Sequence, residues 1–210
     1  MTSLHDFLDE KEQVQDQSFV VDDENKIKND IKILGDTTII FLRRHSGETI
    51  ETLVDTKSLD KISEIKNRWF ANWDKHTQSF YVMASVKKNN GRQKGVLLHR
   101  HLTNCPNGLQ VDHVNHDTLD NRIKNLRIVT LSQNLQNLKG AYKNNTSGIR
   151  GVDKKDGRWR ARIQVNKKPI HLGYFDNEHE AEKAAIQARI KYFPHSKEAM
   201  EHEKSSRLFR

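Results

Sequence analysis

The sequence lacks several features that would place it in other classes of protein. Cys105 is the only cysteine, so no disulfide can form within the chain and a zinc site built from cysteine pairs is excluded. Apolar runs such as Ile39–Leu42 are far too short to cross a bilayer. The first residues, MTSLHDFLDEKEQ, have no basic segment followed by an apolar core, so we expect no signal peptide. These absences predict a soluble, cytoplasmic protein with no membrane partner.

Negative charge is scarce outside the start of the chain. Residues 1–36 hold 10 acidic and 4 basic residues, a net of −6, which leaves 18 acidic and 32 basic residues for residues 37–210, a net of +14. A basic body of this kind indicates a polyanionic partner, although a well-solvated surface has the same composition. With 34% hydrophobic residues among 210, the chain can form one or two small domains with modest cores.

The first half of the chain predicts an arm and an accessory region. Residues 1–30 are acidic and weakly patterned, which is typical of a flexible arm. Residues 31–95 show β-branched runs, turn signals and one helical spacing, which predict a small α+β region. The elements expected are strands on either side of Gly35-Asp36, strands at 49–54, 81–86 and 95–99, and a helix through Leu59, Ile62, Ile65 and Trp69.

The central stretch, Leu109–Asn137, combines short apolar strands with an unusual number of polar side chains. A strand ending near His113, a polar loop, a second strand at Leu126–Val129 and a helix beginning at Thr130 predict a β-loop-β-α unit. Thr130 and Gln133 have the spacing of a capping box. The apolar stripe expected on this helix is Leu131, Leu135 and Leu138.

The residue types in this stretch suit phosphodiester hydrolysis. A histidine can take a proton from water near its own pKa, and a cation can take up the charge that builds on the phosphate. A carboxylate and amide oxygens suit Mg²⁺ or Mn²⁺. Asp112 and His113 are neighbours in a strand and would face opposite ways, so the site requires the backbone to turn at His113.

The segment VDHVNHDTLDNRIKNLRIVTLSQN closely resembles phage-type HNH endonucleases, which have a ββα-metal (His-Me finger) fold. The resemblance implies that His113 is the general base and that Asp112 and Asn134 are ligands of one divalent ion. It also implies that Asn125 holds the loop and orients His113. Asn134 stands where other branches of the family have histidine, and its amide oxygen favours Mg²⁺ or Mn²⁺ over Zn²⁺. The domain expected from this resemblance is 96–140.

Other residues of this segment have competing interpretations. The resemblance gives Asn121 a role in stabilising the loop and makes Arg122 a phosphate contact. The asparagines and Asp112 also suit a simple hairpin turn, but the ordered set as a whole favours the nuclease. His113 and His116 have the spacing of a zinc pair, but a third ligand is lacking in the sequence nearby, so we do not predict zinc.

The last part of the chain predicts a second module after a polar linker at 141–147. Arg158–Val165 alternates between apolar residues and arginines, as in a strand with one buried face. We expect a three-stranded antiparallel sheet with one packed helix at 148–193, the helix capped by Asn177 and ended by Pro194. The small face expected on this helix includes Ala181, Ala185 and Ala188. A basic tail is predicted at 194–210.

The module SGIRGV…GRWRARI…IHLGYFD…EAEKAA resembles the APETALA2-type DNA-binding domain, which places a three-stranded sheet in the major groove. It departs from that family at Asp156, where a tryptophan is usual, and at Pro169, where a basic residue is usual. Base specificity is therefore not carried over. The positions that the resemblance implies on the DNA face are Arg150, Arg160, Arg162, Gln164 and His171.

Together these features predict an α+β protein with a ββα-metal nuclease core. The expected function is a metal-dependent DNA endonuclease that hydrolyses phosphodiester bonds in double-stranded DNA, as a strand-nicking, homing-type or phage DNA-processing enzyme. It is expected in the cytoplasm of a bacterial host cell, encoded by a phage or mobile element. A non-catalytic, sequence-specific DNA-binding regulator and an RNA-directed nuclease are the alternatives.

Overall fold

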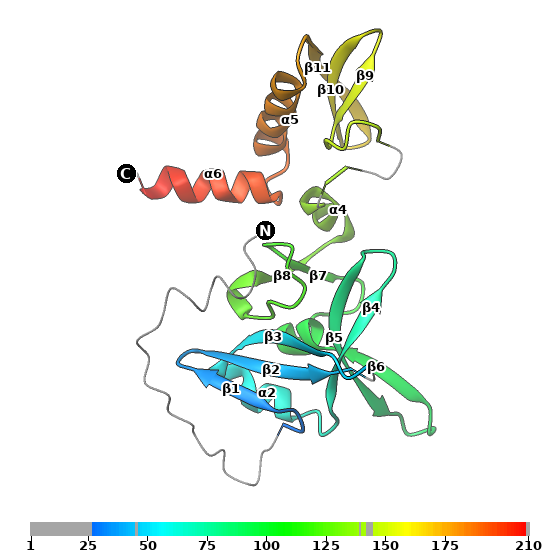
Figure 1. Ribbon diagram of the computed structural model, residues 1–210, viewed down its shortest axis with the longest axis vertical. Coiled ribbons are helices and arrows are strands. Elements are labelled where there is room, and N and C mark those ends of the chain that lie inside the picture. The colour runs from blue at the N-terminus through cyan, green and yellow to red at the C-terminus, as the bar shows by residue number, and fades with distance from the viewer. Residues whose placement is uncertain (1–26, 45, 139, 142–144, 209–210) are drawn as a thin grey trace. The chain divides into compact units, whose positions relative to one another are not determined.

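The computed structural model describes residues 27–44, 46–138, 140–141 and 145–208, which form helices and small antiparallel sheets (Figure 1). The arm predicted for residues 1–30 lies outside the described residues except for its last four positions. The chain divides into two compact units, Met1–Cys105 with Asp117–Arg127 and Pro106–His116 with Ile128–Arg210. None of the helices in the described part of the chain has the length and apolar character needed to cross a membrane.

The first sheet of the first unit has the order β1-β2-β3 and is antiparallel, as the sequence predicts. Its strands are β1 (Ile31–Leu34), β2 (Thr37–Arg43) and β3 (Thr49–Asp55). Gly35, with φ +58°, makes the turn between the first two strands, a backbone conformation that glycine adopts without strain. Ile40, Leu42 and Val54 are fully buried and form part of the core of this unit.

The second sheet has the order β4-β5-β6, with β4 (Trp69–Asp74), β5 (Ser79–Lys87) and β6 (Gln93–Leu97). The helix predicted through Trp69 is wrong, because η1 (Thr56–Ser58) and α2 (Leu59–Ser63) end before it and Trp69 begins β4. Trp69 pairs with Ala84, and both are fully buried. The Asn29 side chain donates to the Trp69 carbonyl at 2.8 Å and accepts from the Trp69 N–H at 2.9 Å. Strand pairing and burial therefore override the helical spacing.

The strand predicted at 95–99 is also too long. It ends at Leu97, and Leu98 begins α3 (Leu98–Thr103). Leu98 and Leu102 are one helical turn apart and both buried, so the apolar run continues on one face of a helix rather than along a strand. Asn104, with φ +49°, ends this helix in the left-handed conformation.

The central stretch forms β7 (Gln110–His113), η2 (Ile123–Asn125), β8 (Leu126–Val129), α4 (Leu131–Asn134) and η3 (Leu135–Asn137). Strands β7 and β8 form a two-stranded sheet. Thr130 and Gln133 form the predicted capping box. The expected apolar stripe is not a buried face, because Leu131 and Leu135 are 57% and 46% exposed. The α-helix ends after one turn, at Asn134, and the chain continues as the 3-10 turn η3.

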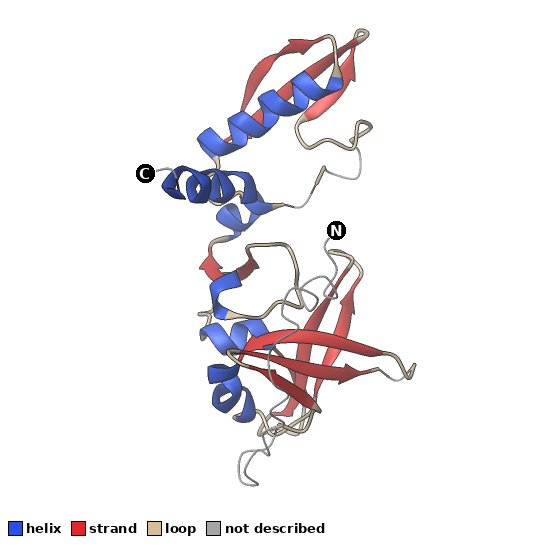
Figure 2. Cartoon of the chain, turned by 60° about the vertical axis from the view of Figure 1, so that its left-hand side comes forward, coloured by secondary structure: helices blue, strands red, loops and turns tan. Residues whose placement is uncertain are grey.

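The C-terminal module has the predicted antiparallel sheet, β9 (Val152–Lys155), β10 (Arg158–Val165) and β11 (Lys168–Phe175), with α5 (Glu178–Tyr192) lying along it (Figure 2). The first strand, predicted at Gly148–Val152, instead begins at Val152. Asn177 caps α5 by accepting from the Glu180 N–H at 2.8 Å. The core is small, as expected from the alanine-rich helix face, and is made by Val152, Ala161, Ala181 and Ala185.

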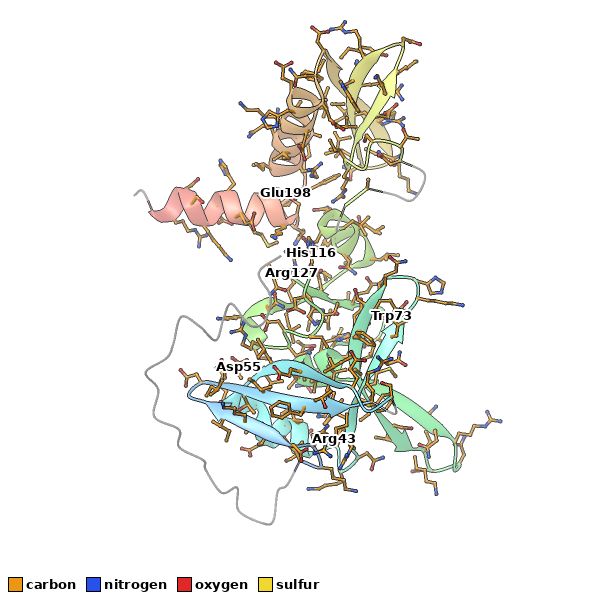
Figure 3. The ribbon with its side chains drawn as sticks, viewed as in Figure 1. Arg43, Asp55, Trp73, His116, Arg127 and Glu198 are labelled. Carbon is orange, nitrogen blue, oxygen red and sulfur yellow. The ribbon has the colours of Figure 1, made fainter. Side chains whose placement is uncertain are left out.

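Most of the basic tail predicted at 194–210 is helical. Lys197–Leu208 form a further helix, α6, and Ser196 at its start is fully buried. The Arg189 side chain of α5 pairs with Glu198 of α6 at 2.7 Å, which ties the two helices together. Glu198 lies near the beginning of α6 (Figure 3).

Candidate active site

Strand β7 ends at His113, where the predicted site requires the backbone to turn. His113 is the last residue of β7, and the His116 N–H donates to the His113 carbonyl at 3.0 Å to close a turn. His116 itself has φ +65°, which is uncommon for a non-glycine residue. Asp112 and His113 are both buried, 8% and 5% exposed. The backbone therefore turns directly after the Asp112-His113 pair.

Asn137 is the side chain that the structure places on the Asp112 carboxylate. Its Nδ2 donates to Asp112 Oδ1 at 3.1 Å and to Oδ2 at 3.0 Å. On the other side of the same amide, His116 Nε2 lies 3.0 Å from Asn137 Oδ1 and 2.7 Å from the Asn137 carbonyl oxygen. Asn137 is 4% exposed, so these contacts are made in a buried setting.

Asn134, the ligand implied by the resemblance, ends α4 and contacts strand β7 at Gln110 rather than at Asp112. Its Nδ2 donates to Gln110 Oε1 at 2.6 Å. Gln110 and Asp112 are two positions apart in β7 and so face the same way. The pairing of Asp112 with Asn134 on one cation stays a prediction.

Sequence reasoning did not identify Asn137 or a role for His116. The signal for Asn137 was its spacing, because residues three apart on a helical turn share a face and Asn137 is three positions after Asn134. His116 carried no signal beyond its spacing from His113, since its contact with Asn137 depends on the tertiary fold.

The donor set at this strand end suits a hard divalent cation. Asp112 offers a carboxylate, and Asn134, which contacts Gln110 on the same face of β7, offers a side-chain amide oxygen. Oxygen donors of these types are the ones that Mg²⁺ and Mn²⁺ favour. Within residues 27–44, 46–138, 140–141 and 145–208, no group of three or more His, Cys, Asp or Glu side chains forms a metal cluster. A divalent cation at this strand end would therefore be held by the Asp112 carboxylate together with an amide oxygen.

The loop between the two strands is held in the first unit by contacts with strands of that unit. Asn121 Nδ2 donates to Thr52 Oγ1 at 2.9 Å, and the Asn121 N–H donates to the Leu53 carbonyl at 2.8 Å. Thr118 Oγ1 donates to the Phe80 carbonyl at 2.6 Å. Asn125 Nδ2 donates to the Asp120 carbonyl at 2.8 Å across the loop. These contacts fix the shape of the loop, whereas the predicted effect of Asn125 on His113 stays a prediction.

Arg122, predicted to contact phosphate, forms an ion pair within this loop. Its Nε and Nη2 donate to the two carboxylate oxygens of Asp120, each at 2.8 Å. The side chains are only 11% and 4% exposed. The hydrogen bond with Asp120 raises the pKa of the Arg122 guanidinium further above its ordinary value. A role in binding phosphate stays a prediction for this residue.

The segment that contains β7, the loop and α4 is similar to a known protein family. Residues 96–136 match the family model described as HNH endonuclease. No solved structure matches the chain. The match covers the Asp112-His113 pair, the loop and Asn134, and it ends one residue before Asn137. It supports a nuclease function in general and therefore a nucleic acid as substrate.

Outside this HNH segment, the sheet of the C-terminal module carries most of the residues that were predicted to contact DNA. Strand register places Arg160 beside Asp153 and Tyr174, and Arg162 beside His171. These side chains share the sheet face opposite to Ala161, which is buried under α5. Gln164 follows on the same face of β10, beside Pro169.

Asp153 partly neutralises this basic face. Arg160 Nη2 lies 2.5 Å and Arg162 Nε 3.3 Å from its carboxylate. The hydrogen bond with Asp153 raises the pKa of Arg160 above its ordinary value. The Arg162 side chain remains 57% exposed, so one guanidinium of the pair is open to solvent.

Arg150 differs from the other predicted DNA contacts in where its guanidinium lies. It donates to the carbonyls of Leu135, Gln136 and Leu138 at 3.0 to 3.1 Å, which are the free carbonyls at the end of the α4–η3 segment. Arg189 Nη1 in turn donates to the Arg150 carbonyl at 2.9 Å. Arg150 therefore holds the segment that carries Asn134 and Asn137 against the C-terminal module.

A groove of about 1090 Å³ lies within the second unit beside these contacts. Its lining includes basic and amide side chains from the η3 end, the start of the module and the end of β10. The residues relevant to an anion are Asn145, Arg150, Lys154, Arg162, Gln164 and Lys167.

Proposed function

We propose that this protein is a metal-dependent DNA endonuclease that hydrolyses phosphodiester bonds in double-stranded DNA. The observation that carries the proposal is the buried Asp112-His113 pair at the end of β7, inside the segment that matches the HNH endonuclease family model. A buried carboxylate and imidazole at a strand end provide the base and the cation ligand that the reaction requires.

In this proposal His113 accepts a proton from the attacking water, at the position where the chain turns out of β7. Asp112 and Asn134 are the residues that hold one Mg²⁺ or Mn²⁺ ion, and Asn125 orients His113 through the loop. The ion supplies positive charge to the phosphate and the leaving oxygen when it is bound. A single site of this kind cuts one strand, so we expect nicks rather than double-strand breaks.

The C-terminal module supplies affinity and choice of site. The basic sheet face with Arg160, Arg162, Gln164 and His171, and the groove beside it, support a contact with the DNA backbone. Replacing Arg160 and Arg162 by alanine should weaken DNA binding and reduce the slope of log affinity against log salt by up to about 2. Unchanged binding would mean that this face is only solvated. The control is the double variant Lys28→Ala with Lys32→Ala. It removes the same amount of positive charge from two exposed lysines of the first unit.

The function is tested by nicking of supercoiled plasmid in Mg²⁺ or Mn²⁺. His113→Ala should lower the rate by about 10²- to 10⁴-fold, which is the usual contribution of a general base. His202→Ala, an exposed histidine of α6, is the control and should leave the rate unchanged. If wild type nicks no faster than His113→Ala, the protein is not this enzyme, and binding without cleavage would favour the DNA-binding regulator. Competition by duplex RNA distinguishes an RNA-directed nuclease.

The biological setting is also part of the proposal. We propose a phage- or mobile-element-encoded protein that acts in the cytoplasm of a bacterial host cell, in homing or in phage DNA processing. The basic charge of residues 37–210 supports a polyanionic partner in that setting.

A further inference from the structure

The buried contacts around Asp112 form a directed chain of hydrogen bonds from His116 through Asn137. His116 Nε2 lies 2.7 Å from the Asn137 carbonyl oxygen, which can only accept, so Nε2 carries a hydrogen. The same Nε2 lies 3.0 Å from the side-chain oxygen Oδ1. The Nε2–H group therefore fixes which end of the Asn137 amide is the oxygen.

The other end of the amide then points to Asp112. Nδ2 donates to both carboxylate oxygens at 3.1 and 3.0 Å, and it lies 3.4 Å from the His113 carbonyl. An oxygen in that place would repel the carboxylate. The requirements of His116 and Asp112 thus agree on one orientation of the Asn137 side chain.

We propose that Asn137 is a positioning residue that fixes the Asp112 carboxylate for cation binding, and that His116 fixes Asn137. The inference rests on the proposed function, because it takes Asp112 as a cation ligand. Asn137 lies just outside the segment matched by the family model.

Two structural features suit this role. Asn137 ends the η3 turn, whose carbonyls are held by Arg150, so its backbone is anchored from the C-terminal module. His116 is held in the left-handed conformation at φ +65°, and a strained residue of this kind persists where its surroundings determine it. His116 follows the end of β7 along the chain and is labelled in Figure 3.

The test measures Mn²⁺ affinity of the full-length protein by calorimetric titration, together with thermal melting. Asn137→Ala should bind Mn²⁺ about 10-fold more weakly than wild type, as is usual when the partner of a ligating carboxylate is removed. His116→Gly should bind about threefold more weakly, since it removes one neutral hydrogen bond while glycine adopts the backbone conformation without strain. Asn107→Ala, an exposed asparagine in the turn before β7, should match wild type.

The combination of variants separates positioning from general damage. Because His116 acts through Asn137, the double variant should bind no more weakly than Asn137→Ala alone, whereas independent effects would multiply. Wild-type affinity in Asn137→Ala, or multiplied losses in the double variant, would overturn the proposal. If Asn137→Ala does not fold, His116→Gly tests the proposal instead. An Mn²⁺ affinity of His116→Gly equal to that of wild type would overturn the proposal.

Asp112→Asn distinguishes this inference from the proposed function. If Asp112→Asn loses Mn²⁺ binding while Asn137→Ala and His116→Gly keep it, only the positioning role fails. If Asp112→Asn binds Mn²⁺ as wild type does, Asp112 is not a ligand and the metal site of the proposed function fails with it.

Discussion

Asp112 and Asp120 are buried aspartates of the same HNH segment, yet they are held by different chemistry. Both carboxylate oxygens of Asp120 accept hydrogen bonds from the Arg122 guanidinium, at 2.8 Å each. Both oxygens of Asp112 accept from the amide of Asn137, at 3.1 and 3.0 Å. The Asn137 amide orients Asp112 through neutral hydrogen bonds, whereas the Arg122 guanidinium holds Asp120 with a charged pair.

The difference separates a structural carboxylate from a candidate ligand. A guanidinium bound to both oxygens leaves little room for a metal ion, so Asp120 suits the task of shaping the loop. A neutral amide orients a carboxylate without pairing its charge, as the partner of a metal-ligating side chain does. Two further carboxylates of the second unit, Asp153 and Glu198, are paired with arginines and so resemble Asp120.

The largest effect expected from this comparison is on catalysis. Asp112→Asn should lower plasmid nicking by more than about 100-fold with little change in melting temperature, because it removes a cation ligand while keeping the shape. Asp36→Asn, at an exposed turn, should nick at the wild-type rate. Nicking by Asp112→Asn within a few-fold of wild type would remove the distinction between the two aspartates.

The second effect is on stability and concerns Asp120. Arg122→Met leaves the Asp120 charge buried without its guanidinium, so the free energy of unfolding in urea should fall by about 3 kcal/mol. Lys124→Met, an exposed change in the same loop, should cost far less. Equal losses for the two variants would show that the buried pair is not what stabilises the loop.

A smaller effect is expected on nucleic-acid binding. Asp153→Asn removes the negative charge beside Arg160 and Arg162, so duplex DNA should bind about threefold more tightly in low salt, with a steeper salt dependence. Asp176→Asn is the control, because its carboxylate is 89% exposed beside Arg158. Weaker binding by Asp153→Asn would mean that Asp153 orients the two arginines rather than competing with DNA for them.

The smallest effect concerns the pH dependence of stability. Burial alone raises the pKa of Glu198, but the hydrogen bond from its own backbone N–H and the charge of Arg189 outweigh this, so the pKa lies below its ordinary value of 4.5. A lowered pKa stabilises the fold at neutral pH, and this contribution is lost as pH falls through the folded-state value.

The measurement compares unfolding of Glu198→Gln and wild type from neutral to acid pH. Glu198→Gln should be less stable above pH 4.5, and the difference should shrink below it. Glu203→Gln, whose side chain is 63% exposed on α6, should show almost no difference from wild type. A gap that is constant with pH would show that the Glu198 charge does not stabilise α6.

Local patterns predicted the elements whose partners lie nearby. The alternation of Arg158–Val165 and the capping spacing at Thr130 and Asn177 depend on neighbouring residues, and the structure confirms them. The helix predicted through Trp69 is wrong because Ala84 and Asn29, both distant in sequence, determine the conformation there. The helix α6 was missed, since its mostly exposed face gives no strong apolar pattern.

By itself, the sequence determined the residue types of the candidate site and their order along the chain, from Asp112-His113 to Asn134. It also determined the basic strand of the C-terminal module. The amide that contacts Asp112 is known only from the folded chain, because Asn134 and Asn137 share a helical face and sequence spacing cannot distinguish them. The same holds for Arg150, because the carbonyls that its guanidinium contacts lie 12 to 15 residues earlier in the chain.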